Sequence, residues 1–137
     1  MKQAWIWFFE RPDAVISPWN VILWWEKRRI PYNIVIGIVG LISLVIYYFL
    51  LETSGYLKPG EDAVEPLVLI IAPVVINICY TGGWIIELIL RLFGLKNMGV
   101  GTALLRIGMV ISLLFALAPA ILWTVIRLLM LFGVKYN

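Results

Sequence analysis

Polar side chains recur at helical spacing within one long apolar stretch, and they are the residues best suited to carry chemistry. In the stretch 66–93, side chains that carry charge or form hydrogen bonds recur three and four residues apart, which places them on one face of a helix. They are Asn77, Tyr80, Trp84, Glu87 and Arg91, with Thr81 beside them. Such a polar stripe can line a path for an ion, a proton or a polar headgroup, or it can hydrogen-bond to neighbouring helices. The sequence leaves both interpretations open.

Glu87 is the only acidic residue inside the apolar stretches. A lone carboxylate at the centre of a membrane helix costs about 2.5–3.5 kcal/mol, and less toward the helix ends. Two arginines are candidate partners: Arg91, one turn further along the same helix, and Arg106, just beyond a short glycine-rich connector. An ion pair between Glu87 and Arg106 would lock two helices together, whereas an unpaired Glu87 would suit a proton carrier.

Small side chains recur every four residues in the stretch 102–132. The series is Gly108, Ser112, Ala116, Ala120 and Thr124. Small side chains let membrane helices approach closely, so this small-residue series predicts helix packing. The series drifts by about 40° per step around a straight helix, and one partner helix would have to wrap along it. That partner is a second copy of the chain or another span, where Gly37, Gly40 and Ser43 form a shorter small face.

The composition places these positions in a membrane. Of the 137 residues, 63% are hydrophobic and 14% are charged, with a mean hydropathy of +0.98. A soluble domain is about 45–50% apolar and about 25% charged. Because the chain has one cysteine and no histidine, it cannot by itself build a His/Cys zinc site, a Ser-His-Asp triad or a Cys-His dyad. We therefore expect an integral membrane protein without a metal or a cofactor.

Three stretches approach or exceed the roughly 20 residues that a helix needs to cross a bilayer. They are 34–51, 66–93 and 102–132, which together make a three-helix membrane domain over residues 34–137. Pro73 and Pro119 are candidate kink points, because each removes a backbone donor. An alternative topology breaks the last stretch at Pro119 into a hairpin that returns both chain ends to the cytoplasm.

Residues 1–33 are predicted to form a cytoplasmic interfacial segment that contains five of the seven tryptophans. Ser17 followed by Pro18 is typical of a helix start. The predicted amphipathic helix covers about 18–29, Pro31 ends it, and Tyr32–Asn33 turns the chain into the membrane. Residues 1–9 are predicted to form a second, shorter helix. The expected membrane-interface anchors are Trp19, Trp24, Trp25, Lys27, Arg28 and Arg29.

The charges predict an orientation and a partner. Basic residues flank the start of the first span and the connector between the second and third, whereas the connector 52–65 carries four acids and one lysine. The positive-inside rule therefore predicts a multi-pass protein of the plasma membrane (the inner membrane in a bacterium) with a cytoplasmic N-terminus and an outside C-terminus. Arg127 and Lys135 oppose this orientation. The net charge of +3 lies next to the membrane, so anionic lipid headgroups are the expected partner and nucleic acid is not.

The sequence thus predicts an all-α integral membrane protein, with three transmembrane helices preceded by a tryptophan-rich amphipathic interfacial helix. The leading hypothesis for function is a small non-enzymatic protein that acts through helix–helix association, as a homo-oligomer or as a subunit of a larger membrane complex. The alternative is an oligomeric ion or proton channel lined by the polar stripe. A lipid-modifying enzyme is the least favoured class, because its carboxylates would be scattered among cations.

Overall fold

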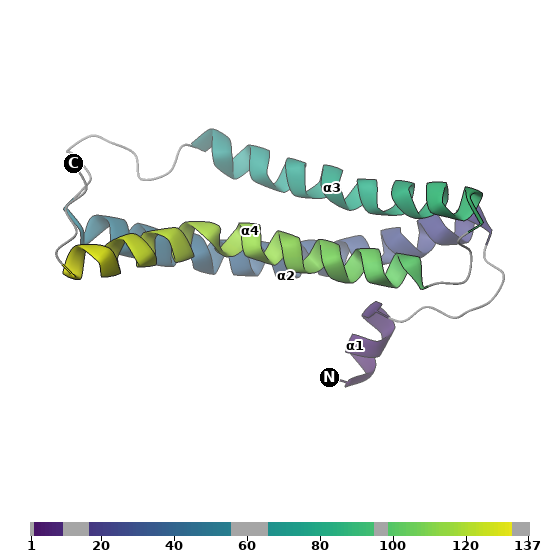
Figure 1. Ribbon diagram of the computed structural model, residues 1–137, viewed down its shortest axis with the longest axis horizontal. Coiled ribbons are helices and arrows are strands. Elements are labelled where there is room, and N and C mark those ends of the chain that lie inside the picture. The colour runs from purple at the N-terminus through teal and green to yellow at the C-terminus, as the bar shows by residue number, and fades with distance from the viewer. Residues whose placement is uncertain (1, 10–16, 56–65, 95–98, 133–137) are drawn as a thin grey trace.

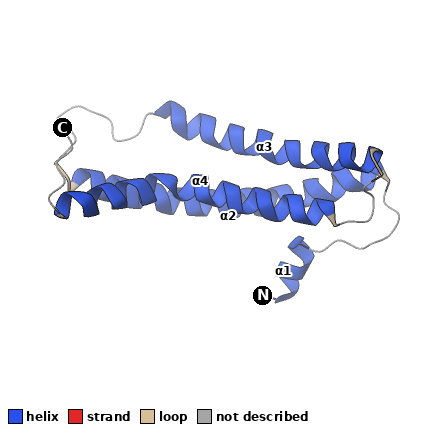
Figure 2. Ribbon diagram, in the orientation of Figure 1, coloured by secondary structure: helices blue, strands red, loops and turns tan. Residues whose placement is uncertain are grey.

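The structure is a computed structural model that describes residues 2–9, 17–55, 66–94 and 99–132. The described residues form four helices and no strand (Figure 2). The helices are α1 (Lys2–Phe9), α2 (Pro18–Glu52), α3 (Pro66–Leu92) and α4 (Val100–Leu131). Each of α2, α3 and α4 is long and apolar enough to cross a membrane. The prediction of three membrane-spanning helices is therefore confirmed at that level.

The three long helices form a bundle in which α2 and α4 run in the same direction and α3 runs against them (Figure 1). The most extensive contacts join α2 to α4, and α3 contacts both helices less extensively. We call the end of the bundle where α2 begins and α3 finishes the tryptophan end, and the opposite end the Glu52 end. The short helix α1 packs at the tryptophan end, where it contacts α4.

The start of α2 follows the prediction. Ser17 is the N-cap, its Oγ accepts a hydrogen bond from the backbone N–H of Asn20 at 3.3 Å, and Pro18 occupies the first helical position. Proline fits there because its missing N–H is one that the first turn of a helix leaves without a partner. Helix α1 likewise agrees with the short helix predicted within residues 1–9.

The predicted break at Pro31 is wrong, because α2 continues without interruption through Pro31, Tyr32 and Asn33. Proline inside a helix costs about 3 kcal/mol or more. Contacts to other helices on both sides of the proline offset this cost: Arg29 binds α3, and Tyr32 and Asn33 bind α4 and α3. The predicted interfacial helix of about 18–29 is thus the first third of a single helix of 35 residues.

The alternative hairpin at Pro119 is also wrong, because α4 is continuous through this proline. Inside a helix a proline crowds the preceding turn and disturbs its hydrogen bonds. Next to Pro119, the backbone N–H of Ala120 donates to the Oγ of Ser43 on α2 at 3.3 Å, and Ser43 is completely buried. A neighbouring hydroxyl that satisfies a backbone group beside a proline is how membrane helices tolerate proline in mid-span.

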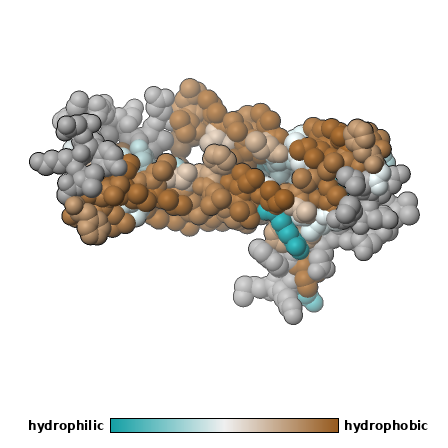
Figure 3. Space-filling model, viewed as in Figure 1, coloured by the Kyte–Doolittle hydropathy of each residue, from teal (hydrophilic) through white to brown (hydrophobic). Residues whose placement is uncertain are grey.

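The well-packed core gathers at the tryptophan end and is rich in aromatic residues. It contains Phe8, Phe9, Val21, Trp24, Trp25, Tyr32, Ile36, Tyr80, Leu105 and Met109. The outward faces of the long helices are instead covered with exposed apolar side chains (Figure 3). At about 1.5 Å per residue, α2 is roughly 52 Å long and exceeds a hydrocarbon core of about 30 Å. The protein therefore offers lipid an apolar surface and keeps its dense core near one end.

Candidate functional site

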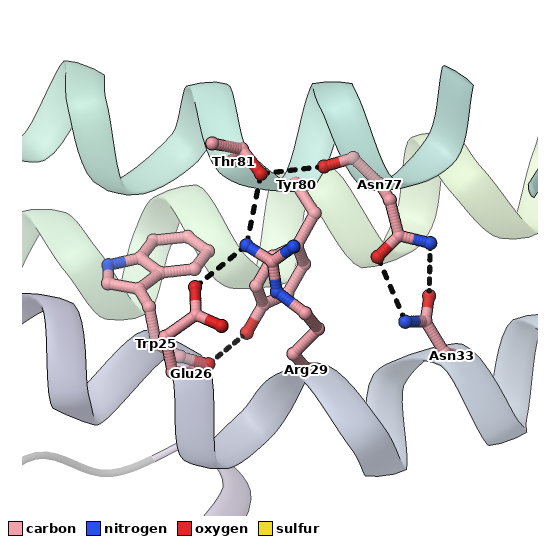
Figure 4. Close-up of polar contacts among 7 residues, drawn as sticks. All are labelled: Trp25, Glu26, Arg29, Asn33, Asn77, Tyr80 and Thr81. Atoms are coloured by element: carbon pink, nitrogen blue, oxygen red, sulfur yellow. Dashed lines mark hydrogen bonds and ion pairs between the residues drawn. The ribbon is translucent and has the colours of Figure 1, made fainter. Parts of the chain in front are cut away.

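The polar stripe of α3 faces α2 and is bonded to it at three successive levels. Close to the tryptophan end, Glu87 contacts Trp25; next, Tyr80 and Thr81 contact the turn of α2 around Arg29; deepest, Asn77 meets Asn33. The last two levels are seen in Figure 4, where the side chains of the two helices point toward one another. The structure thus brings these predicted residues together, with α2 as their common partner.

Glu87 is completely buried, and two N–H donors among the described residues bind its carboxylate. The indole Nε1 of Trp25 donates to Oε2 at 2.7 Å, and the Nε of Arg91 donates to Oε1 at 2.8 Å. Arg91 is four residues away on the same helix, and its side chain is 18% exposed. A buried carboxylate is tolerated when it is both ion-paired and hydrogen-bonded, and Glu87 meets both conditions.

Of the two candidate partners of Glu87, the structure pairs Arg91 with it and places Arg106 elsewhere. The guanidinium of Arg106 instead lies over the ring of Phe9 in α1, 5.5 Å from its centroid. Arg106 is exposed on α4, next to the buried Leu105 that faces the core. Because α4 turns Leu105 inward, the following side chain points about 100° away, toward α1 rather than toward α3.

Trp25 lies at the centre of this region and depends on a glycine. Its ring packs edge-on against Tyr80, with centroids 5.2 Å apart, and the Tyr80 hydroxyl donates to the Trp25 carbonyl at 2.5 Å. A Cβ placed on Gly83 would lie 2.8 Å from the Cη2 of the same indole. The absence of a side chain at Gly83 therefore lets the ring lie against the backbone of α3 and reach Glu87.

Arg29 and Asn33 bind the deeper part of the stripe (Figure 4). The Nη2 of Arg29 donates to the Oγ1 of Thr81 at 3.0 Å and to the Oε1 of Glu26 at 2.7 Å. Asn33 and Asn77 exchange two amide hydrogen bonds, of 3.0 and 3.3 Å. Two amides that satisfy each other in this way bind helices together without placing a net charge in the membrane.

Trp84 is the member of the stripe that departs from this pattern. Its side chain is half-buried against the aromatic core, and its indole N–H is buried with no hydrogen-bond partner among the described residues. Trp84 therefore contributes apolar packing to the stripe, and the hydrogen bonds come from its neighbours.

Several residues predicted to anchor the chain in lipid headgroups are buried in the protein instead. Trp24, Trp25 and Arg28 are only 8%, 2% and 5% exposed, because α1, α3 and α4 cover this part of α2. Arg29 is partly buried in its contacts with Glu26 and Thr81. Of the predicted anchors, Trp19 and Lys27 are exposed, so these two remain available to lipid.

Arg28 fastens α1 to α2. Its Nε donates to the carbonyl of Phe8 at 2.8 Å, and its Nη2 donates to the carbonyl of Trp7. Both carbonyls lie in the last turn of α1, where a helix leaves acceptors without partners and favours a cation. The guanidinium carbon also lies 4.1 Å from the ring centroid of Trp24 and 4.8 Å from that of Trp7.

The small-residue series of α4 meets α2 only along its middle. Ser112 and Ala120 are buried there: the hydroxyl of Ser112 lies 2.5 Å from that of Tyr32, and the N–H of Ala120 donates to Ser43. Ala116 packs against the same core, whereas Gly108 has no neighbour within 4 Å of a Cβ and Thr124 is exposed. A drift of about 40° per step turns the two ends of the series away from one straight partner.

The residues that the sequence-based prediction missed belong to α2. Trp25, Arg29 and Asn33 follow one another at intervals of four and form the complement of the α3 stripe. That spacing is visible in the sequence, but the predicted break at Pro31 assigned Asn33 to a different segment from Trp25 and Arg29. Tyr32, which binds α4, was missed in the same way, whereas Ser43 was named as part of a small face and the structure bonds it to Ala120 of α4. The role of Gly83 could not be predicted from the adjacent glycines Gly82 and Gly83, because it depends on where the Trp25 indole lies.

The site therefore consists of matched polar contacts between α2 and α3, beside an open groove. The groove has a volume of about 620 Å³ and is bordered by Arg29 on α2 and by α3 residues from Pro73 to Ile85. Among the described residues, no three Cys, Asp or Glu side chains come close enough to hold a metal ion. No protein-family model, curated protein or solved structure matches this chain.

Proposed function

We propose that the protein is a small, non-enzymatic membrane protein that acts by association with a second copy of itself through α3. The observation that carries this proposal is how little of α3 is covered by its own chain. Only 6% of its most apolar window is buried, against 17% for the corresponding windows of α2 and α4. Every described side chain from Leu67 to Val75 is exposed.

The face of α3 that points away from α2 and α4 has the spacing of a helix-packing seam. We call this the α3 seam; its residues lie alternately three and four apart, the interval at which paired helices interlock. They are Ala72, Val75, Cys79, Gly82 and Ile86. Four of them are exposed, and nothing lies within 4 Å of a Cβ on Gly82. Three of the five residues are small, which lets two membrane helices approach closely, and a face related to itself by a twofold axis needs no second type of partner.

The hydrogen bonds within the chain favour association over conduction. The stripe that would line a channel is bonded to α2 through Trp25, Arg29 and Asn33. Opening a polar path along it would require these contacts between α2 and α3 to break, whereas association leaves them intact. The α3 seam, by contrast, is apolar and can pack against another helix without disturbing the bundle.

We further propose that the tryptophan end faces the cytoplasm of a plasma membrane. The described cations at this end are Lys27, Arg28, Arg29, Arg91 and Arg106, whereas Glu52 and Arg127 lie at the opposite end. The positive-inside rule then places the first and last described residues on opposite sides of the membrane. Anionic lipid headgroups are the expected surroundings of the tryptophan end.

The single cysteine of the chain provides a direct test of association. Cys79 lies at the centre of the α3 seam and is exposed, so a copper–phenanthroline oxidant should convert the wild-type protein in membranes to a disulfide-linked dimer. The variant Cys79→Ser should give none. In the matched control, Cys79→Ser combined with Leu114→Cys moves the thiol to an exposed position on α4.

The proposal requires the Cys79 dimer to form much faster than the Leu114→Cys dimer. A bulky substitution in the seam, Ala72→Trp, should slow dimer formation, because packed helices tolerate overfilling poorly. Equal rates for both thiols would indicate random collisions and would refute association through α3. A particle that stays monomeric in nanodiscs at every protein-to-lipid ratio would also refute association through α3.

A further inference from the structure

The groove between α2 and α3 combines a charged group with apolar walls. Arg29 borders it from α2, and the α3 side is formed by seven residues. They are Pro73, Val74, Asn77, Ile78, Thr81, Gly82 and Ile85. Val74 and Ile78 are exposed apolar residues, and the groove is open along its length rather than enclosed. It therefore opens sideways, toward the space that lipid occupies around a membrane protein.

The guanidinium of Arg29 is fixed in place at the polar level of the groove. Its Nη2 is bonded to Thr81 and Glu26, and its charge lies 5.2 Å from the ring centroid of Tyr80. Its Nε is buried and has no hydrogen-bond partner in the described part of the chain. A planar cationic group that is already positioned by its neighbours, and whose side chain is still 27% exposed, suits a phosphate oxygen.

The length of the groove matches one leaflet of a bilayer. From Pro73 to Ile85 the α3 wall rises by about 18 Å, at about 1.5 Å per residue, and one leaflet contributes about 15 Å of hydrocarbon. From Thr81 to Pro73, the part that runs from the cation toward the membrane centre, the length is about 12 Å. One charged group at the end of an apolar channel of this length is complementary to a single lipid molecule.

The volume of the groove favours a lipid chain over a helix. A helix with its side chains is about 10 Å wide, so 18 Å of it occupies about 1,400 Å³. The groove offers about 620 Å³. An extended acyl chain fits within that space, whereas a second copy of α3 could only lie across its open side. Gly82 borders both the groove and the α3 seam, but it has no side chain, and the other four residues of the seam do not line the groove. A lipid chain along Val74 and Ile78 and a partner on the seam therefore contact different side chains.

We propose that this groove binds an anionic phospholipid from the leaflet at the tryptophan end. Its phosphate binds Arg29 and Thr81, and one acyl chain lies along Ile78 and Val74. Glu26 neutralises Arg29 in the unoccupied groove, but its side chain is 41% exposed. Ion pairs that are this accessible to water contribute only about 0–1 kcal/mol. The Glu26 carboxylate therefore turns toward water when a phosphate takes its place.

Lipid retention measured by native mass spectrometry tests the proposal. The full-length protein is reconstituted in nanodiscs of equal parts phosphatidylglycerol and phosphatidylcholine and then released from them. The wild type should retain phosphatidylglycerol in preference to phosphatidylcholine, and Arg29→Gln should retain about tenfold less, the expected effect of one lost charged contact. Lys27→Gln is the matched control, because Lys27 is an exposed cation two residues away that does not border the groove.

A second variant tests the acyl-chain part of the groove without altering charge. Ile78→Trp fills the space beside Val74 at an exposed position, so it should leave folding intact and reduce retention of the lipid. Inorganic phosphate serves as the competitor that lacks a chain, and it should not displace the lipid at millimolar concentration.

Three results would overturn the proposal: equal losses in Arg29→Gln and Lys27→Gln, unchanged retention in Ile78→Trp, or displacement by inorganic phosphate alone. The first would indicate general attraction to a cationic surface, and the others would remove the acyl chain from the site. Arg29→Gln should still form the Cys79-linked dimer at the wild-type rate. Failure of lipid binding and failure of association are therefore distinguishable.

Discussion

Gly83 offers the sharpest test of how α2 and α3 pack, because its neighbour Gly82 is a matched control one residue away. A methyl group on Gly83 would lie 2.8 Å from the Cη2 and 3.0 Å from the Cζ3 of Trp25, whereas nothing lies within 4 Å of a Cβ on Gly82. Trp25 is 2% exposed, so its ring can move only against the side chains that surround it. We therefore expect Gly83→Ala to push the indole away from α3 and to weaken its bond to Glu87.

The expected change in the free energy of unfolding of Gly83→Ala follows from three contributions. Overpacking a filled core costs about 1–3 kcal/mol, and losing a buried hydrogen bond to a charged group costs about 1.5–3 kcal/mol. Replacing glycine by alanine inside a helix returns about 1 kcal/mol. Gly83→Ala should therefore destabilise the protein by about 1.5–5 kcal/mol, and Gly82→Ala should stabilise it by up to about 1 kcal/mol.

Thermal unfolding of the purified protein in one detergent, followed by circular dichroism, measures this difference. At about 4 °C per kcal/mol, Gly83→Ala should lower the apparent midpoint by at least about 6 °C relative to the wild type. The same change in a Trp25→Phe background should cost much less, because the shorter ring withdraws the atoms that meet the methyl group. If Gly83→Ala proved as stable as Gly82→Ala, the described packing of Trp25 against α3 would be refuted.

Two other substitutions test contacts at the tryptophan end. Arg28→Met removes two charged hydrogen bonds to α1, together worth at least about 3 kcal/mol, so amide exchange in residues 2–9 should accelerate by about a hundredfold. Lys27→Met is the control. An equal effect of both substitutions would contradict the role of Arg28 in holding α1 against α2. Glu87→Gln leaves Arg91 without its acid and should destabilise the bundle by about 1–3 kcal/mol in a denaturant titration. Glu26→Gln breaks a partly exposed ion pair and should lower the free energy of unfolding by less than about 1 kcal/mol. Equal losses in Glu87→Gln and Glu26→Gln would show that burial of Glu87 adds nothing to the strength of its contacts.

The features that could be predicted from the sequence are those that one segment determines by itself. The lengths of the apolar stretches predicted three helices able to span a membrane, and Ser17–Pro18 predicted the start of α2. The spacing of the stripe placed Asn77, Tyr80 and Glu87 on one face of α3, where the structure has them. None of these inferences requires knowledge of a neighbouring helix.

The end of a helix at proline is a local rule that contacts between helices can override. Pro31 removes one backbone donor, but Arg29 and Asn33 on either side of it bind α3 only if α2 runs straight between them. The sum of those contacts is invisible in a sequence that has been divided at Pro31. The same division hid the register of Trp25, Arg29 and Asn33, and with it the partner of the α3 stripe.

The partner of Glu87 shows why the orientation of one helix decides a contact that spacing leaves open. Arg91 is placed by the geometry of α3 alone, since four residues along a helix return to the same face. The position of Arg106 depends on the rotation of α4 about its own axis. Its place just beyond the short connector made Arg106 a candidate partner of Glu87, but spacing does not give that rotation. In the structure α4 instead turns Leu105 and Met109 into the core together with Ser112. This choice of face directs the Arg106 guanidinium toward Phe9 of α1, and Trp25 of α2 takes the position beside the Glu87 carboxylate for which Arg106 was a candidate.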